Sequence, residues 1–259
     1  MGLFDKKFCD ICGGKIGLLG NRKLDDGNLC KDCAAKLSPF FSERRRSTVA
    51  DIREQLEYRE ANLEKVAAFK VTRTLGAGTK VLMDEDNKNF IVSSNRRYQE
   101  ANPDVLSFSQ VTGCNVDIDE QRNELKQRDK DGNERSYNPP RFEHEYNFYI
   151  IIHVNHPYFS EIRFKLNNLP IKIMPPVGRV MMPSSTEIGR MSVDYREYAA
   201  MAEEIKSALT QVRQDERESI AAVNAPKTAS ICPHCGATTI ADSQGCCEFC
   251  GGAMGAFMS

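Results

Sequence analysis

The chain has 259 residues with 35 basic and 36 acidic side chains, and this near balance does not favour nucleic acid or an anionic membrane as its main partner. Its longest apolar run, residues 148–154, is far shorter than the roughly 20 residues of a membrane span, and residues 1–10 carry no signal-peptide pattern. We therefore expect a cytoplasmic protein without a transmembrane segment.

Eight of the ten cysteines fall into four Cys-x-x-Cys pairs. In a chain without an export signal, this spacing predicts metal binding rather than disulfides. A redox-active Cys-x-x-Cys site is the alternative, but two such pairs at the spacing of a zinc finger favour metal binding. Four thiolates suit zinc and leave no open position for water, so we expect two structural zinc ions. The predicted ligands are Cys9, Cys12, Cys30 and Cys33 near one end of the chain, and Cys232, Cys235, Cys247 and Cys250 near the other.

Residues 5–41 predict a treble-clef-like zinc finger. Two glycines follow Cys12 directly, and glycines at this place let the backbone fold tightly over a metal, as a zinc knuckle requires. A polar turn at residues 25–28 indicates a short hairpin, and the second cysteine pair then opens a helix. A knuckle, a hairpin and a helix in this order resemble a treble clef.

Residues 43–68 predict a connecting helix. Ser47 or Thr48 can cap its start, with Asp51 as the capping-box partner. An apolar stripe at three- and four-residue steps runs along it and is interrupted by Arg59. So narrow a stripe packs against one neighbour, either in the same chain or in a second copy as a dimer. The stripe consists of Val49, Ile52, Leu56, Leu63 and Val66.

Residues 69–214 predict a pleckstrin-homology-like domain. This is an α+β fold, an antiparallel β-barrel or curved sheet with a C-terminal helix. The apolar pattern of residues 146–166 predicts its central hairpin, with a turn at 155–158. The closing helix, residues 193–214, begins after Ser192 and carries an uninterrupted apolar stripe. The other expected strands are residues 69–74, 80–83, 89–93, 105–110, 116–125 and 170–174.

Two stretches of this domain predict no regular structure. Residues 129–145 are polar and rich in turn formers, which indicates a long exposed loop, and residues 175–191 contain three prolines and two glycines. Binding residues concentrate in exposed loops, so residues 129–145 and the turn at 155–158 are where we expect any recognition by this domain. The nearby histidines are expected at turns or on the surface. They are His144, His153 and His156.

The last part of the chain predicts a linker and a second metal module. Residues 215–230 are polar and alanine-rich, which is typical of a helical or disordered linker. Residues 231–252 predict a zinc ribbon, because a glycine follows each of its two cysteine pairs and a short loop joins them. Cys246 could compete with Cys247 as a ligand. Cys114, far from both modules, is expected to be a small buried hydrophobe.

The N-terminal block FCDICGGKIGLL…LCKDCAAKLSPF resembles a bacterial, Gram-positive-type family of unknown function whose members begin with a four-cysteine zinc-binding domain. The segment NPDVLSFSQVTGCNVDIDE…YIIIHVNHPYFSEIRFKLN is similar to the one that accompanies that domain, so the resemblance extends over residues 5–215. It implies metal binding through the first four cysteines and no established activity. The tail CPHCGATT…CCEFCGG is similar to zinc ribbons that end many bacterial proteins, including membrane scaffolds of the stomatin and prohibitin type.

No catalytic set is recognisable in the sequence. The Gly76-Ala77-Gly78 loop is too short for a phosphate loop, and no nucleophile is paired with a base. We therefore expect a non-catalytic zinc-binding adaptor, not an enzyme, with another protein or a membrane-associated scaffold as its partner. A nucleic-acid-binding zinc-finger protein is the alternative. The arginines at residues 44–46 could contact phosphates, although a solvated charge run is the simpler interpretation.

Overall fold

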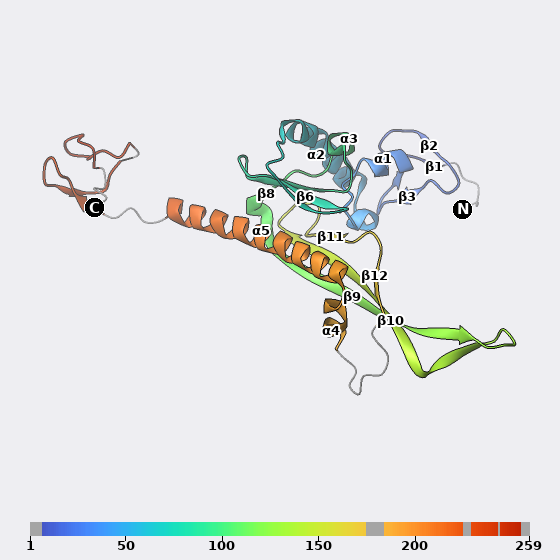
Figure 1. Cartoon of the computed structure of the whole chain (residues 1–259). Helices are drawn as coiled ribbons and strands as arrows, with labels where there is room; N and C mark the ends of the chain where they lie inside the picture. Colours follow the sequence, from blue (N-terminus) through green and yellow to red (C-terminus); the bar gives the residue numbers. More distant parts are fainter. Residues whose placement is uncertain (1–6, 175–183, 225–228, 243, 255–259) are drawn as a thin grey trace. The chain divides into compact units, whose positions relative to one another are not determined.

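The computed structural model describes residues 7–174, 184–224, 229–242 and 244–254 (Figure 1). The chain divides into two compact units, residues 1–214 and residues 215–259, and each is described by itself. None of the helices in the described ranges is long and apolar enough to cross a bilayer.

The N-terminal segment folds around a small core of its own. Two hairpins of two-residue strands, one more than the sequence predicts, are followed by the predicted short helix. The elements are β1 (Lys7–Phe8) paired with β2 (Lys15–Ile16), β3 (Arg22–Lys23) paired with β4 (Asn28–Leu29), and α1 (Lys31–Ala35). The core residues are Ile16, Leu24, Leu29, Leu37 and Ile52, with Cys9 and Cys33 beside them. So small a core needs a further constraint to be stable.

The predicted helix over residues 43–68 is in fact two elements. A 3₁₀ turn, η1 (Glu43–Arg46), comes first, and α2 (Val49–Ala68) begins only at the predicted cap. Oγ1 of Thr48 accepts a hydrogen bond from the backbone N–H of Asp51 at 3.2 Å, and the Asp51 carboxylate accepts one from the N–H of Thr48 at 2.8 Å. An N-cap residue has extended backbone angles, so the helix cannot continue back through Thr48 to residue 43.

The buried face of α2 differs from the predicted apolar stripe. Arg59 does not interrupt this face but belongs to it, at 6% exposure, whereas Leu63 is 43% exposed. The face packs within the chain: Ile52 joins the N-terminal core, and Val66 packs with Leu82 and Ile91 of a neighbouring sheet. The buried residues are Ile52, Gln55, Arg59, Asn62 and Val66.

The first sheet of the central region is antiparallel, with the strand order β5-β6-β7-β8. Its two middle strands are buried on both faces, because the end of α2 covers one face and the main core covers the other. Both strands are therefore continuous apolar runs rather than alternating ones. The elements are β5 (Arg73–Gly76), β6 (Lys80–Asp84), β7 (Asn89–Ser93), helix α3 (Tyr98–Ala101), β8 (Leu106–Ser107) and the 3₁₀ turn η2 (Phe108–Gln110).

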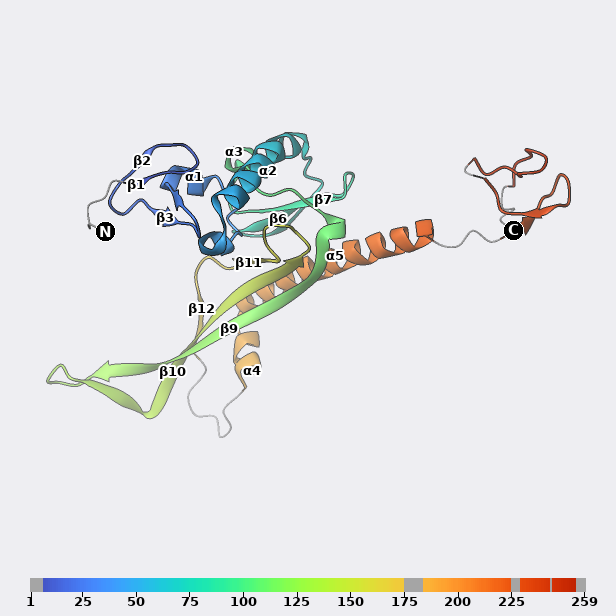
Figure 2. The same ribbon diagram turned by 180° about the vertical axis from the view of Figure 1, so that it is seen from behind.

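The second sheet is built on one long central strand, β10. β9 pairs along one edge of β10, and β11 and β12 pair with its other edge, all antiparallel. The predicted hairpin over residues 146–166 is confirmed, with Ile152 opposite Ile162. Figure 2 shows β9 and β10 running side by side, as in Figure 1. The elements are β9 (Val111–Arg128), β10 (Glu134–Val154), β11 (Glu161–Lys165) and β12 (Ile171–Ile173).

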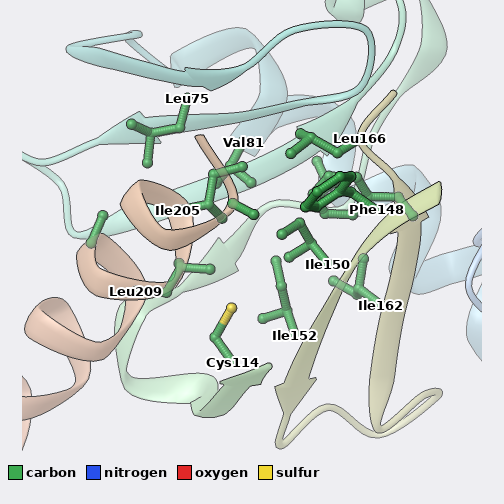
Figure 3. Close-up of a cluster of buried hydrophobic side chains, with 14 of the residues drawn as sticks. Leu75, Val81, Cys114, Phe148, Ile150, Ile152, Ile162, Leu166, Ile205 and Leu209 are labelled. Atoms are coloured by element: carbon green, nitrogen blue, oxygen red, sulfur yellow. The ribbon is translucent and has the colours of Figure 1, made fainter. Parts of the chain in front are cut away.

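The two sheets and the helix α5 (Val193–Asn224) share one hydrophobic core (Figure 3). Phe148, Ile150 and Ile152 of β10 point toward Ile205 and Leu209 of α5 in this core. The predicted cap is confirmed, since Oγ of Ser192 accepts a hydrogen bond from the N–H of Tyr195 at 3.3 Å. The result is a mixed α+β fold of open antiparallel sheets.

The prediction of a long exposed loop at residues 129–145 is wrong for most of this range. Residues 134–145 belong to β10 and pair with β9, from Glu134 opposite Arg128 onward, so only residues 129–133 form the turn. The sequence is misleading here because the strand is largely solvated on both faces and contains Pro139 and Pro140. The pairing shifts register between Ser136 and Arg141, which leaves the two prolines, with no N–H to donate, outside the regular ladder.

Other predicted boundaries also need correction. Residues 175–191 were expected to be irregular, yet α4 (Ser185–Arg190) lies within them, and residues 175–183 fall outside the described part of the chain. The linker predicted at residues 215–230 is helical at its start, because α5 continues to Asn224. Beyond it, β13 (Ser230–Ile231) pairs with β14 (Thr238–Thr239) in the C-terminal unit.

Candidate metal centres

The four N-terminal cysteines come together as predicted. The Sγ atoms of Cys9, Cys12, Cys30 and Cys33 all lie within 4.8 Å of one another, and those of Cys12 and Cys30 are 3.8 Å apart. Ligands about 2.3 Å from a tetrahedral zinc ion are separated by about 3.8 Å, whereas a disulfide brings its sulfurs to about 2.05 Å. The cluster therefore has the dimensions of a four-thiolate metal site and could hold one ion.

A tight knuckle presents the first cysteine pair. The N–H of Gly13 donates to the carbonyl of Cys9 at 2.8 Å, and the N–H of Cys9 donates to the carbonyl of Gly14 at 2.9 Å. Gly13 has a φ of +69°, in the left-handed region that side chains disfavour. The glycine that the sequence places after Cys12 is therefore required by the backbone that turns both sulfurs to the same side.

The second N-terminal pair is held by a helix instead. Cys30 is the N-cap of α1, and its Sγ accepts a hydrogen bond from the N–H of Cys33 at 3.3 Å. Sγ of Cys9 accepts another from the N–H of Cys30 at 3.3 Å. A backbone N–H that donates to a thiolate stabilises it, so the contact from Cys30 favours the charged form of Cys9.

The C-terminal unit repeats the knuckle twice. Sγ of Cys232 is 3.6 Å from that of Cys250, and Sγ of Cys235 is 3.7 Å from that of Cys247, again close to tetrahedral edges. Gly236 and Gly251 have φ values of +73° and +68°, and their N–H groups donate to the carbonyls of the first cysteine of each pair. Each of the glycines in the sequence pattern thus has the role that Gly13 has in the first cluster.

The structure places Cys247, rather than Cys246, in the C-terminal cluster. Sγ of Cys246 lies 3.8 Å from the carbonyl oxygen of Gln244, and its backbone forms an isolated bridge with Ala253. Cys114 lies in the main core (Figure 3), where burial raises the pKa of its thiol to about 11. A buried thiol that stays protonated is inert, as the sequence predicts for this position.

One cysteine in each cluster ionises more readily than an ordinary thiol. Burial opposes the ionisation of Cys9, but backbone hydrogen bonds from Cys12, Cys30 and Ile11 outweigh it and lower the pKa of Cys9 to about 6. The pKa of Cys232 is lowered to about 6 by the same balance. The pKa of Cys33 is raised, chiefly by burial, and that of Cys250 is raised to about 12. Cys9 and Cys232 are thus available as thiolates at neutral pH, and metal binding to a cysteine cluster releases protons.

Among the residues that the structure describes, no histidine of the central region joins a metal-binding cluster. His144, expected at a turn or on the surface, lies in β10 at 4% exposure with Nδ1 2.7 Å from Oε1 of Glu120. The turn at residues 155–158 is not a free loop either, because Nε2 of His156 lies 2.9 Å from the hydroxyl of Tyr58 on α2. His144 and His156 therefore make contacts within the chain, in β10 and with α2.

A buried polar network, for which the sequence pattern gives no sign, attaches the N-terminal segment to the central region. Nη1 of Arg59 donates to Oδ1 of Asp104 at 2.7 Å, and Oγ of Ser38 donates to Oδ2 of the same carboxylate at 2.7 Å. Arg59 also donates to the carbonyls of Lys36 and Asn102. The network joins the end of the finger, α2 and the segment before β8, so the finger has a fixed place beside the central sheets.

A comparison with known protein families matches the N-terminal segment. Residues 7–55 match a family described as "Domain of unknown function (DUF4428)", and this range contains the whole first cysteine cluster. The resemblance expected over residues 5–215 is thus found over its first part. No curated protein and no solved structure matches the chain.

Proposed function

We propose that this chain is a non-catalytic adaptor of the cytoplasm, in which two structural zinc modules flank a pleckstrin-homology-like domain and contact another protein. The closed geometry of both cysteine clusters is the observation that carries this proposal. Four mutually close sulfurs complete a tetrahedral shell and leave no position for a reacting water or substrate. Each metal would then stabilise the fold of its module, as is typical of small modules with a small hydrophobic core.

The way in which each cysteine pair is held supports the proposed module types. A knuckle followed by a hairpin and a pair at a helix start supports a treble-clef-like finger at the N-terminus. Two knuckles with a short strand pair support a zinc ribbon in the C-terminal unit. For the central region, two antiparallel sheets over one core with a packed C-terminal helix support a pleckstrin-homology-like arrangement, here with open sheets.

Exposed apolar side chains give the two modules a means of contacting a protein. In the C-terminal ribbon, Ile231 and Phe249 are 71% and 70% exposed. In the N-terminal finger, Leu18 and Leu19 are 86% and 83% exposed. In modules this small the metal can supply the stability that a larger core would otherwise provide, so large apolar residues remain available for a partner.

A comparison of captured partners tests this proposal at the ribbon. Ile231→Ser combined with Phe249→Ser removes two apolar contacts without changing a cysteine, so we expect the variant to keep both metals and lose partner proteins that the wild type captures. Ile220→Ser is the matched control, because Ile220 is 53% exposed on α5 and lies outside both modules. Capture is measured by mass spectrometry after pull-down, with metal content measured on the same samples. Identical partner sets for all three chains would contradict the ribbon's role.

A further inference from the structure

The N-terminal finger carries a basic pocket that the metal site does not use. It has a volume of about 620 Å³ and lies between β3, the turn after it and the 3₁₀ turn η1. The lining contains four cationic side chains and a single carboxylate, that of Asp25. The cationic residues are Arg22, Lys23, Arg44 and Arg45.

The geometry of η1 explains why its three arginine side chains point in different directions. Successive residues of a 3₁₀ turn point about a third of a turn apart, so three consecutive arginines face three directions. Arg46 points outward and pairs with Glu43 at 3.2 Å, with its side chain 86% exposed. Arg44 and Arg45 instead line the pocket. Glu43 pairs with Arg46 and is not among the residues that line the pocket.

Arg44 is the residue that points to a ligand. Its Nη1 is buried, with no hydrogen-bond partner among the residues that the structure describes. Burial, and then the like charges of Arg22 and Arg45, lower the pKa of Arg44, although an arginine remains charged at neutral pH. A buried guanidinium N–H without an acceptor and beside two further guanidinium groups is unfavourable unless an anion joins them.

We propose that this pocket binds a phosphate monoester group, which the guanidinium groups of Arg22, Arg44 and Arg45 contact. Guanidinium forks match the oxygens of a phosphate in charge and geometry, which makes clustered arginines suited to a dianion. The group can belong to a soluble molecule or to a lipid headgroup. The exposed Leu18 and Leu19, adjacent to the pocket in sequence, would enter the bilayer in the second case.

A nucleic-acid backbone fits the pocket less well. None of the described residues that line it is aromatic, so no base can stack there. Asp25 at the pocket and the exposed Glu43 beside it would face an extended polyanion, whereas a single phosphate group avoids them. The concave shape and the convergence of three arginines favour one compact anion.

Titration with inorganic phosphate at constant ionic strength tests the proposal, followed through the arginine side-chain signals of the full chain by NMR. We expect saturable shifts in the wild type, and binding weaker by about tenfold or more in Arg44→Gln, because charged hydrogen bonds are lost. Arg46→Gln is the matched control and should bind as the wild type does, since Arg46 lies outside the pocket. Both variants should keep both metals.

Vesicles of phosphatidylcholine with and without phosphatidic acid identify the source of the group. Sedimentation with phosphatidic acid that is lost in Arg44→Gln and in Leu18→Ser assigns a lipid headgroup. Binding of inorganic phosphate without sedimentation assigns a soluble phosphate monoester. Two results would overturn the site: no saturable response of the wild type to phosphate, or equal weakening by Arg44→Gln and Arg46→Gln together with tighter binding of an RNA oligonucleotide.

Discussion

Cys9→Ser and Cys232→Ser should each remove one metal ion from the chain, and the double variant should bind none. The two clusters share no residue, so each loss should be independent of the other. Metal binding contributes an apparent free energy of about 10–16 kcal/mol in zinc-finger peptides, which is far more than the small N-terminal core can replace. We therefore expect the finger of Cys9→Ser to become sensitive to protease while the central sheets remain folded.

Two cysteines outside the clusters serve as matched controls for this experiment. Cys114→Ser and Cys246→Ser should keep both metals, because neither thiol belongs to a cluster in the structure. Elemental analysis of the purified variants measures the outcome, with limited proteolysis on the same samples. Loss of metal from Cys246→Ser, with retention by Cys247→Ser, would reassign the ligand of the C-terminal cluster.

Asp104→Ala should lower the free energy of unfolding by about 3–5 kcal/mol, because it leaves a buried arginine unpaired. The side chains of Arg59 and Asp104 are 7% and 0% exposed, and Ser38 would lose its acceptor as well. Removing both charges, with Arg59→Met and Asp104→Leu together, should cost less than Asp104→Ala alone, since no isolated charge remains. Chemical denaturation followed by circular dichroism measures each change.

A surface ion pair provides the comparison for the buried one. Arg97 and Glu100 are 3.1 Å apart, with side chains 79% and 61% exposed. Arg97→Ala should change the free energy of unfolding by less than about 1 kcal/mol, because water screens the pair. If Asp104→Ala were as mild as Arg97→Ala, the network would not be what holds the finger against the central sheets.

Local chemistry accounts for the features that could be predicted from the sequence. The cysteine spacing and the glycine after the second cysteine are both determined within a few residues, as the left-handed Gly13 and Gly236 show. The capping box of Thr48 and Asp51 spans four residues, and the hairpin over residues 146–166 follows from the pattern of apolar side chains. In each case the residues that determine the local structure lie within the segment itself, so the structure can be predicted without knowing its tertiary contacts.

Features that depend on distant partners could not be predicted in the same way. Residues 134–145 form a strand because β9 supplies the pairing, and their polar, proline-containing sequence gives no sign of it. The pattern around Arg59 indicates a break in an apolar stripe, because its partner Asp104 lies 45 residues away in sequence. The basic pocket likewise requires β3 and η1 to come together, which the run of three arginines alone does not show.

The metal content of the purified wild-type chain tests the central claim most directly. Native mass spectrometry combined with elemental analysis should find two zinc ions per chain, because the structure contains two clusters with the dimensions of a four-thiolate site. Chelation should then unfold the N-terminal finger and the C-terminal ribbon. A wild-type chain that is free of metal and fully folded at both ends would contradict the account.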